Sequence, residues 1–95
     1  LVCVGTHKVL YSDLDCNMHV TSFHYVLWVM DTISLDEYKE KAITEAEINF
    51  IKECRYGETV SLYREDISEN EAVFEIRNAE GEVLNRQRMV FSKRK

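Results

Sequence analysis

The longest apolar segment of the chain runs from Phe23 to Ile33, where eight of eleven positions are hydrophobic. These positions fall on all sides of a helix, and a helix without a polar face is buried on most sides. Thr21 and Ser22 precede the segment and offer hydroxyl groups that cap a helix N-terminus. We therefore expect a buried helix over residues 23–33 as the central element of the core.

A shorter helix and four strands are predicted after this segment. Ser34 and Glu37 have the spacing of a capping box, which predicts an exposed second helix ending near Lys41. Runs rich in β-branched and aromatic residues, separated by short polar turns, predict strands over residues 43–53, 59–66, 72–78 and 83–93. A similar run over residues 2–11 predicts a first strand. Short connections make successive strands antiparallel neighbours.

Together these elements predict an α+β hotdog fold, a curved antiparallel sheet of about five strands wrapped around one long buried helix. A four-stranded sheet with a helix on one face is the alternative, and it explains a wholly apolar helix less well. In the strand over residues 43–53, Ala46, Ile48 and Phe50 alternate and mark the expected core face. Glu47 and Asn49 lie on the opposite face.

Composition and charge narrow the class of protein. With 95 residues, 45% of them hydrophobic and 31% charged, the chain reads as one folded domain and not as a disordered segment. A net charge of −5 argues against binding to nucleic acid. No apolar run is long enough to span a membrane, so no membrane association is expected. Three cysteines without framework spacing predict reduced thiols.

The segment SDLDCNMHV, residues 12–20, concentrates the candidate chemistry. Asp13, Asp15, Asn17 and His19 recur at every second position, so an extended loop would place them on one side. They come just before the predicted helix, whose free N–H groups and positive dipole end polarise a nearby carbonyl oxygen. For Asp13, the plainer role of binding loop backbone groups fits best.

This segment, with several residues beyond it, resembles the acyl-acyl carrier protein thioesterases of bacteria and plant plastids. The matching positions are Ser12, Asp13, Leu14, Asp15, Asn17, His19, Val20, Tyr25, Trp28, Glu53 and Cys54. Thr21 and Ser22 replace two asparagines that usually follow in the family. The family carries two hotdog domains in tandem, with these motifs in the second. The resemblance therefore implies that residues 1–95 are a single hotdog domain, the C-terminal half of a tandem double-hotdog protein, and the start at Leu1 points the same way.

The resemblance implies an enzyme that hydrolyses acyl-acyl carrier protein thioesters to free fatty acid, without a cofactor. The alternatives are an acyl-CoA thioesterase and a non-catalytic acyl-binding or dimerisation module of the same fold. The implied partners are acyl carrier protein and a second hotdog domain or a homodimer partner. The implied location is the bacterial cytoplasm, in preference to the plastid stroma. The domain alone is expected to be inactive, because the family forms its acyl pocket largely from the first domain.

The resemblance also implies a catalytic group of Asp15, Asn17, His19 and Glu53, in which a carboxylate activates water. Cys54 is the alternative, as a nucleophile paired with His19. Glu53 and Cys54 are adjacent, so a regular strand aims only one of them at His19. The alternation of core-facing residues along this strand, if continued, places Cys54 on the core face. A lysine interrupts that alternation, so it does not decide between Glu53 and Cys54. Hydrolysis through a carboxylate is the commoner hotdog chemistry, and we favour Glu53.

A metal site is also considered, with four possible ligands: Cys16, His19, His24 and Cys54. The pair Cys16 and His19 has no second pair at finger-like spacing, so we expect no metal site. His24 lies inside the apolar segment and is expected to be a packed ring with one hydrogen bond. Tyr25 and Trp28 are expected in the core, with Tyr25 placed to border an acyl tunnel.

Overall fold

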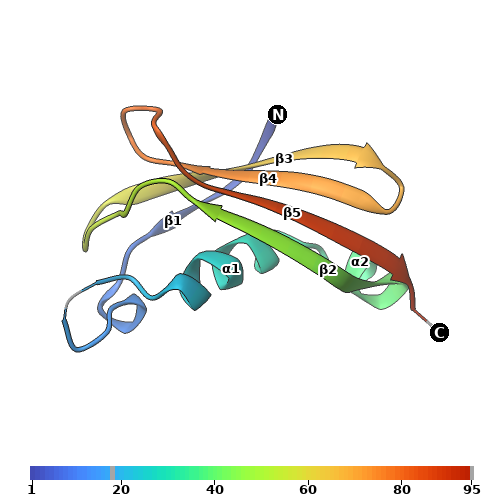
Figure 1. The fold of residues 1–95 in the computed structure, drawn as a ribbon, viewed down its shortest axis with the longest axis horizontal. Coiled ribbons are helices and arrows are strands. Elements are labelled where there is room, and N and C mark those ends of the chain that lie inside the picture. Colours follow the sequence, from blue (N-terminus) through green and yellow to red (C-terminus); the bar gives the residue numbers. More distant parts are fainter. Residues whose placement is uncertain (18, 95) are drawn as a thin grey trace.

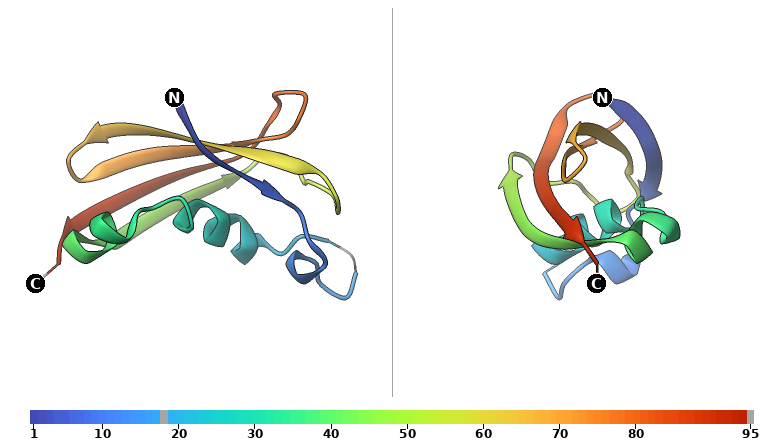
Figure 2. Two further views of the ribbon diagram at one scale, coloured as in Figure 1. Left: turned by 180° about the vertical axis from the view of Figure 1, so that it is seen from behind. Right: turned by 90° about the vertical axis from the view of Figure 1, so that its right-hand side faces the viewer.

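A curved antiparallel sheet forms most of the molecule (Figure 1). The computed structural model describes residues 1–17 and 19–94. Its strands are β1 (Val2–Lys8), β2 (Lys41–Phe50), β3 (Thr59–Ser68), β4 (Glu71–Arg77) and β5 (Val83–Lys93). They are arranged in the order β1-β3-β4-β5-β2, and every pairing is antiparallel. Figure 2 shows the sheet curving around helix α1 (Ser22–Met30), which confirms the predicted hotdog fold.

The core lies between α1 and the concave face of the sheet. Alternate residues of β4, namely Ala72, Phe74 and Ile76, are buried there, as expected for a strand with one covered face. Tyr25 and Trp28 are each 3% exposed, so the prediction that both belong to the core is confirmed. Within residues 1–17 and 19–94, neither helix is long and apolar enough to cross a membrane.

Helix α1 is shorter and less enclosed than the sequence predicts. It begins at Ser22 and ends at Met30, where the N–H of Asp31 still donates to the Leu27 carbonyl. Phe23 is 65% exposed and Met30 is 43% exposed. The prediction that this helix is buried on most sides is therefore wrong, because the sheet of this chain covers only one face of it.

The predicted burial of the apolar face of β2 is also wrong. Ala46 is exposed, as are Ile48 at 38% and Phe50 at 49%. The reason is the position of β2 at the edge of the sheet, where it pairs only with β5. Phe50 contacts the Tyr25 ring of α1, with centroids 5.7 Å apart, but the edge position leaves all three side chains exposed to solvent.

The strand predicted to continue to residue 53 ends at Phe50. The N–H groups of Ile51 and Lys52 both donate to the Leu84 carbonyl, at 2.9 and 3.0 Å, so the chain leaves the regular ladder there. Glu53 and Cys54 consequently lie in an irregular segment. The alternation of a regular strand, which turns adjacent side chains to opposite faces, does not apply to them.

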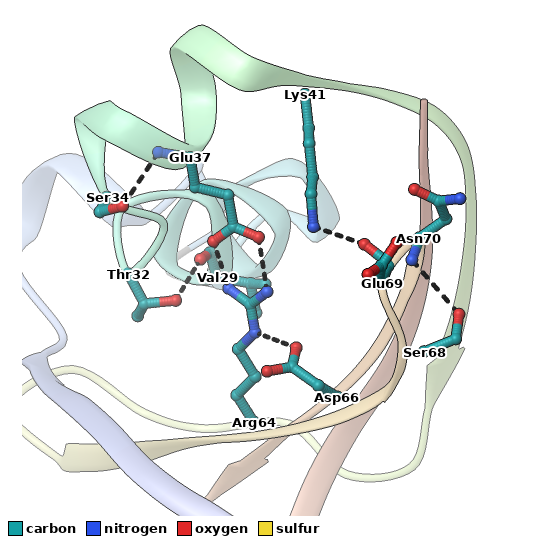
Figure 3. A network of polar contacts seen from close by, with 10 residues as sticks. All are labelled: Val29, Thr32, Ser34, Glu37, Lys41, Arg64, Asp66, Ser68, Glu69 and Asn70. Carbon is teal, nitrogen blue, oxygen red and sulfur yellow. Dashed lines mark hydrogen bonds and ion pairs between the residues drawn. The ribbon is translucent and has the colours of Figure 1, made fainter. Parts of the chain in front are cut away.

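Helix α2 (Leu35–Glu40) begins as predicted, because the Ser34 hydroxyl accepts a hydrogen bond from the Glu37 N–H at 3.1 Å. Figure 3 shows how α2 is fastened to the sheet. Arg64, on β3, donates from Nη1 and Nη2 to the two oxygens of Glu37 at 2.8 and 2.6 Å. Its guanidinium also lies 5.3 Å from the Phe74 ring centre and 5.9 Å from that of Phe91.

Candidate active site

The polar loop between residues 12 and 20 is a closed turn and not an extended segment. Leu14 and Val20 form an antiparallel bridge, and the Asp15 N–H donates to the His19 carbonyl at 2.9 Å. Position 18 lies outside the described residues. The turn places Asp15, Asn17 and His19 on the exposed surface, while Asp13 is buried. The expectation that all four polar residues share one side is therefore wrong for Asp13.

Asp15 holds this turn together through its carboxylate. Oδ1 accepts hydrogen bonds from the backbone N–H groups of Asn17, at 2.8 Å, and His19, at 3.1 Å. The hydrogen bond from His19, followed by that from Asn17, holds the pKa of Asp15 below its ordinary value. Asp15 is consequently a weak base and a good anchor for the residues that follow it.

His19 and Glu53 meet although they are 34 positions apart in the sequence. His19 Nδ1 lies 2.6 Å from Glu53 Oε1. Because an ionised carboxylate only accepts hydrogen bonds, Nδ1 carries the proton and donates it to this contact. The side chains of His19 and Glu53 are 62% and 49% exposed, so the pair stands open to solvent at the surface of this chain.

Cys54 points into the core and contacts Tyr25. The Tyr25 hydroxyl accepts hydrogen bonds from the Cys54 N–H at 3.2 Å and from its thiol at 3.4 Å. Burial raises the pKa of the Cys54 thiol, which leaves less of the reactive thiolate. Of the two adjacent candidates, the structure therefore turns Glu53 toward His19 and Cys54 toward the helix.

Asp13 is the centre of a buried cluster that the sequence pattern did not reveal. Its Oδ2 accepts from His7 Nε2 and the Leu10 N–H, both at 2.8 Å. Its Oδ1 accepts from His24 Nδ1 at 2.9 Å and Trp28 Nε1 at 3.2 Å. Burial alone would raise the pKa of Asp13, but these hydrogen bonds outweigh it and lower the pKa to about 2.

The cluster corrects one expectation and bears out another. Asp13 binds a loop N–H as predicted, but most of its partners are side chains from β1 and α1. His24 is a packed ring hydrogen-bonded to Asp13, as its place in the helix predicted. The spacing of His24 and Trp28, one helical turn apart, was the available signal for a shared partner. The ring of His7 stacks on Trp28 with centroids 4.5 Å apart, and no local pattern indicates that contact.

The candidate metal ligands are not brought together. Cys16 is exposed, Cys54 is buried and His24 is bound to Asp13. Within residues 1–17 and 19–94, no group of three or more His, Cys, Asp or Glu side chains is placed to hold a metal ion.

Solved structures with this fold include thioesterases. An acyl-ACP thioesterase from Bacteroides thetaiotaomicron is 31% identical, with a TM-score of 0.90 over 95% of this chain and 37% of its own. The 12:0-ACP thioesterase from Umbellularia californica is 18% identical, with a TM-score of 0.85 over 97% of this chain and 36% of its own. A Staphylococcus aureus protein in complex with CoA is 12% identical, with a TM-score of 0.83 over 93% of this chain and 72% of its own.

The family comparison agrees with the first of these structures. No curated protein matches the sequence. The chain spans 37% and 36% of the two acyl-ACP thioesterases, so it corresponds to just over a third of each. The family described as the acyl-ACP thioesterase C-terminal domain matches residues 4–93, nearly the whole sequence. The chain therefore belongs to the acyl-ACP thioesterase C-terminal domain family.

Proposed function

We propose that the protein hydrolyses acyl-ACP thioesters to free fatty acid, with Glu53 as the base that activates water. Family membership supports thioester hydrolysis in general. The observation that carries the assignment of Glu53 is its 2.6 Å contact with His19, which presents a carboxylate beside the turn that bears Asp15 and Asn17.

In the proposed reaction, the second oxygen of Glu53 takes a proton from a water molecule whose oxygen attacks the thioester carbonyl carbon. The N–H groups at the start of α1, three residues after His19, stabilise the oxyanion that forms. The carbon–sulfur bond then breaks. The leaving thiolate takes the proton from Glu53, so the products are a carboxylic acid and the thiol of the carrier.

The other three residues act in supporting roles in this proposal. Asp15 fixes the turn through its bonds to the Asn17 and His19 backbone. His19 donates from Nδ1 and orients the Glu53 carboxylate. Asn17 is exposed in the middle of the turn, and we propose that its amide positions the water. No cofactor takes part.

We also propose that residues 1–95 are the C-terminal half of a tandem double-hotdog protein. The exposure of the site, of Phe23 on α1 and of the β2 edge supports a second hotdog domain, or a homodimer partner, that covers them. Acyl carrier protein is the proposed substrate carrier. The bacterial cytoplasm is the proposed location, in keeping with the likeness to a Bacteroides enzyme.

The test measures kcat in the complete protein, with any residues that flank positions 1–95. We expect Glu53→Gln to lower kcat by about 10²–10⁴-fold, the range for loss of a general base, with folding intact. The matched control, Cys54→Ala, should keep kcat within a few-fold. If Cys54→Ala lost activity and Glu53→Gln kept it, Cys54 and not Glu53 would be the catalytic residue. A trapped acyl-cysteine would lead to the same conclusion.

The substrate carrier is the second point to test. The fold is shared with a protein whose structure contains CoA, so acyl-CoA is the competing substrate class. We expect a higher kcat/KM for long-chain acyl-ACP than for the acyl-CoA with the same chain. A preference for acyl-CoA would support the alternative enzyme. Large losses of kcat in Asp15→Ala and His19→Ala, with folding intact, would favour the enzyme over an acyl-binding or dimerisation module. Unchanged turnover in both variants would exclude these two residues from catalysis.

A further inference from the structure

A cavity lies at the opposite end of α1 from the candidate active site, between α2 and the strands β2 and β5. Its volume is about 700 Å³, within the range of small-molecule sites. Its apolar wall includes Met30, Ile33, Leu35, Ile43 and Phe91. Such a wall binds hydrocarbon through removal of apolar surface from water.

This cavity is separate from the candidate active site. Asp15, His19 and Glu53 lie beside the N-terminus of α1, whereas the cavity begins at Met30, the last residue of the helix. A helix of nine residues is about 13 Å long at 1.5 Å per residue, so the length of α1 separates the two sites.

Lys41 and Arg94 place two positive charges on the cavity wall. Arg94 donates from Nε to the Tyr38 carbonyl at 2.8 Å and from Nη2 to the Lys41 carbonyl at 3.4 Å. The ammonium of Lys41 donates to the Glu69 carbonyl, a contact drawn in Figure 3. All of these partners are neutral backbone groups, so they satisfy hydrogen bonds without cancelling charge.

The nearby carboxylates form no direct ion pair with these cations, although Arg64 foremost, and Lys41 after it, lower the pKa of Glu37. Glu37 also lines the cavity, but both of its oxygens are bound by Arg64, as Figure 3 shows. In the described part of the chain, no ion pair includes Lys41 or Arg94. The cavity wall therefore carries two cations, Lys41 and Arg94, and two carboxylates, Asp31 and Glu37, of which Glu37 is bound by Arg64.

We propose that this cavity binds a single-chain fatty carboxylate, with the hydrocarbon along the apolar wall and the carboxylate at Lys41 and Arg94. Among the described residues the two cations on the wall of this apolar cavity form no ion pair, and such a site matches an amphiphile with one anionic end. The ligand class is also the product class of the proposed hydrolysis, but binding at this site does not depend on that reaction.

The test uses the complete protein with labelled Met, Ile and Leu methyl groups, titrated with decanoate and with 1-decanol below their aggregation limits. We expect saturable shifts at Met30, Ile33 and Ile43 with decanoate. Lys41→Met keeps the apolar stem and removes the charge, so it should weaken decanoate binding by about three- to tenfold, within the range for one charged contact. It should leave decanol binding unchanged. The control Lys8→Met, at an exposed lysine on β1, should leave both unchanged.

Three results would overturn the inference: no saturable shift, shifts confined to Ile51 beside the candidate active site, or equal binding of decanoate by Lys41→Met. If Lys41→Met fails to fold, Arg94→Gln tests the same charge requirement. Glu53→Gln separates this inference from the proposed function, because it should lower kcat by about 10²–10⁴-fold while decanoate binding persists. Binding without any turnover in the unmodified protein would refute the proposed function alone.

Discussion

Asp13 carries more of the local structure than its place in a polar segment predicts. Its carboxylate joins β1, the turn before the site, and α1 through four hydrogen bonds. The turn that bears Asp15 and His19 begins directly after it. The Thr21 N–H, just after the turn, also donates to the Asp13 carbonyl at 3.4 Å, so Asp13 is a positioning residue for the turn that bears the candidate active site.

The first prediction concerns this carboxylate. Asp13→Asn should lower the free energy of unfolding by about 2–4 kcal/mol near neutral pH, because hydrogen bonds to a buried charge are replaced by weaker or mismatched ones. Chemical denaturation measures the difference. The control Asp36→Asn, at an exposed position of α2, should change stability by less than about 1 kcal/mol. Equal effects of the two variants on stability would contradict the role of Asp13 as the buried acceptor of these hydrogen bonds.

The pH dependence of this effect has a defined sign. The pKa of Asp13 is lowered from 3.8 to about 2 in the folded chain. Its stabilising contribution is therefore complete above the unfolded value and is lost as the pH falls from 3.8 toward 2. The difference in stability between the unmodified protein and Asp13→Asn should shrink across that window. A difference that grows there would contradict the lowered pKa.

The sequence identifies some site residues and not others for physical reasons. Asp15, His19 and Glu53 were grouped by resemblance, and the fold brings them into one hydrogen-bonded set. Their catalytic roles stay predictions. His7 was not identified, because its contact with Asp13 depends on how β1 passes the start of α1. Side-chain contacts between elements leave no periodic trace in a single sequence.

At the scale of elements, the polar and apolar pattern found every strand but did not locate every covered face. The strand predicted over residues 83–93 matches β5, a central strand with neighbours on both sides. For β2 and α1, the pattern marked apolar faces correctly and burial wrongly. Apolar side chains indicate that a face is suited to a covering layer, and this chain supplies that layer to only one side of α1.

Helix α2 gives the second prediction. Its six residues are too few for a stable isolated helix, so tertiary contacts must hold it. Glu37→Gln breaks the bidentate salt bridge with Arg64. It should lower the free energy of unfolding by about 1–3 kcal/mol, because both side chains are largely shielded from solvent. Amide hydrogen exchange in α2 should accelerate. Glu40→Gln, at an exposed position of the same helix, is the control and should leave exchange unchanged.

Acid should release the same contact. Arg64 holds the pKa of Glu37 below its ordinary value of 4.5, so the pair stabilises α2 above that value and loses its effect as the pH falls through the lowered pKa. Exchange of the α2 amides, corrected for the intrinsic pH effect, should rise on acidification. It should rise less in Glu37→Gln, whose pair is already broken.

For the whole molecule, the exposed apolar side chains mark the surface that the proposed second domain or dimer partner would cover. Ile48, Phe50 and Ile51 follow one another along and beyond the β2 edge, and Phe23 lies on the uncovered side of α1. The candidate site opens beside them, with His19 and Glu53 half exposed. A domain with an unpaired strand edge and an open active site is poorly suited to hold an acyl chain by itself.

The last prediction follows from that edge. Residues 1–95 alone should self-associate, as a two-fold dimer paired along β2, because an edge strand with apolar side chains favours pairing with another chain. Sedimentation at increasing concentration should show the dimer, and Ile48→Lys should dissociate it. Val2→Lys, at an exposed apolar residue on the opposite edge strand β1, is the matched control and should not. Turnover of long-chain acyl thioesters should be negligible in either state, because the surface that would enclose the acyl chain is lacking. A monomer at all concentrations with robust turnover would show that the exposed edge and open site need no partner.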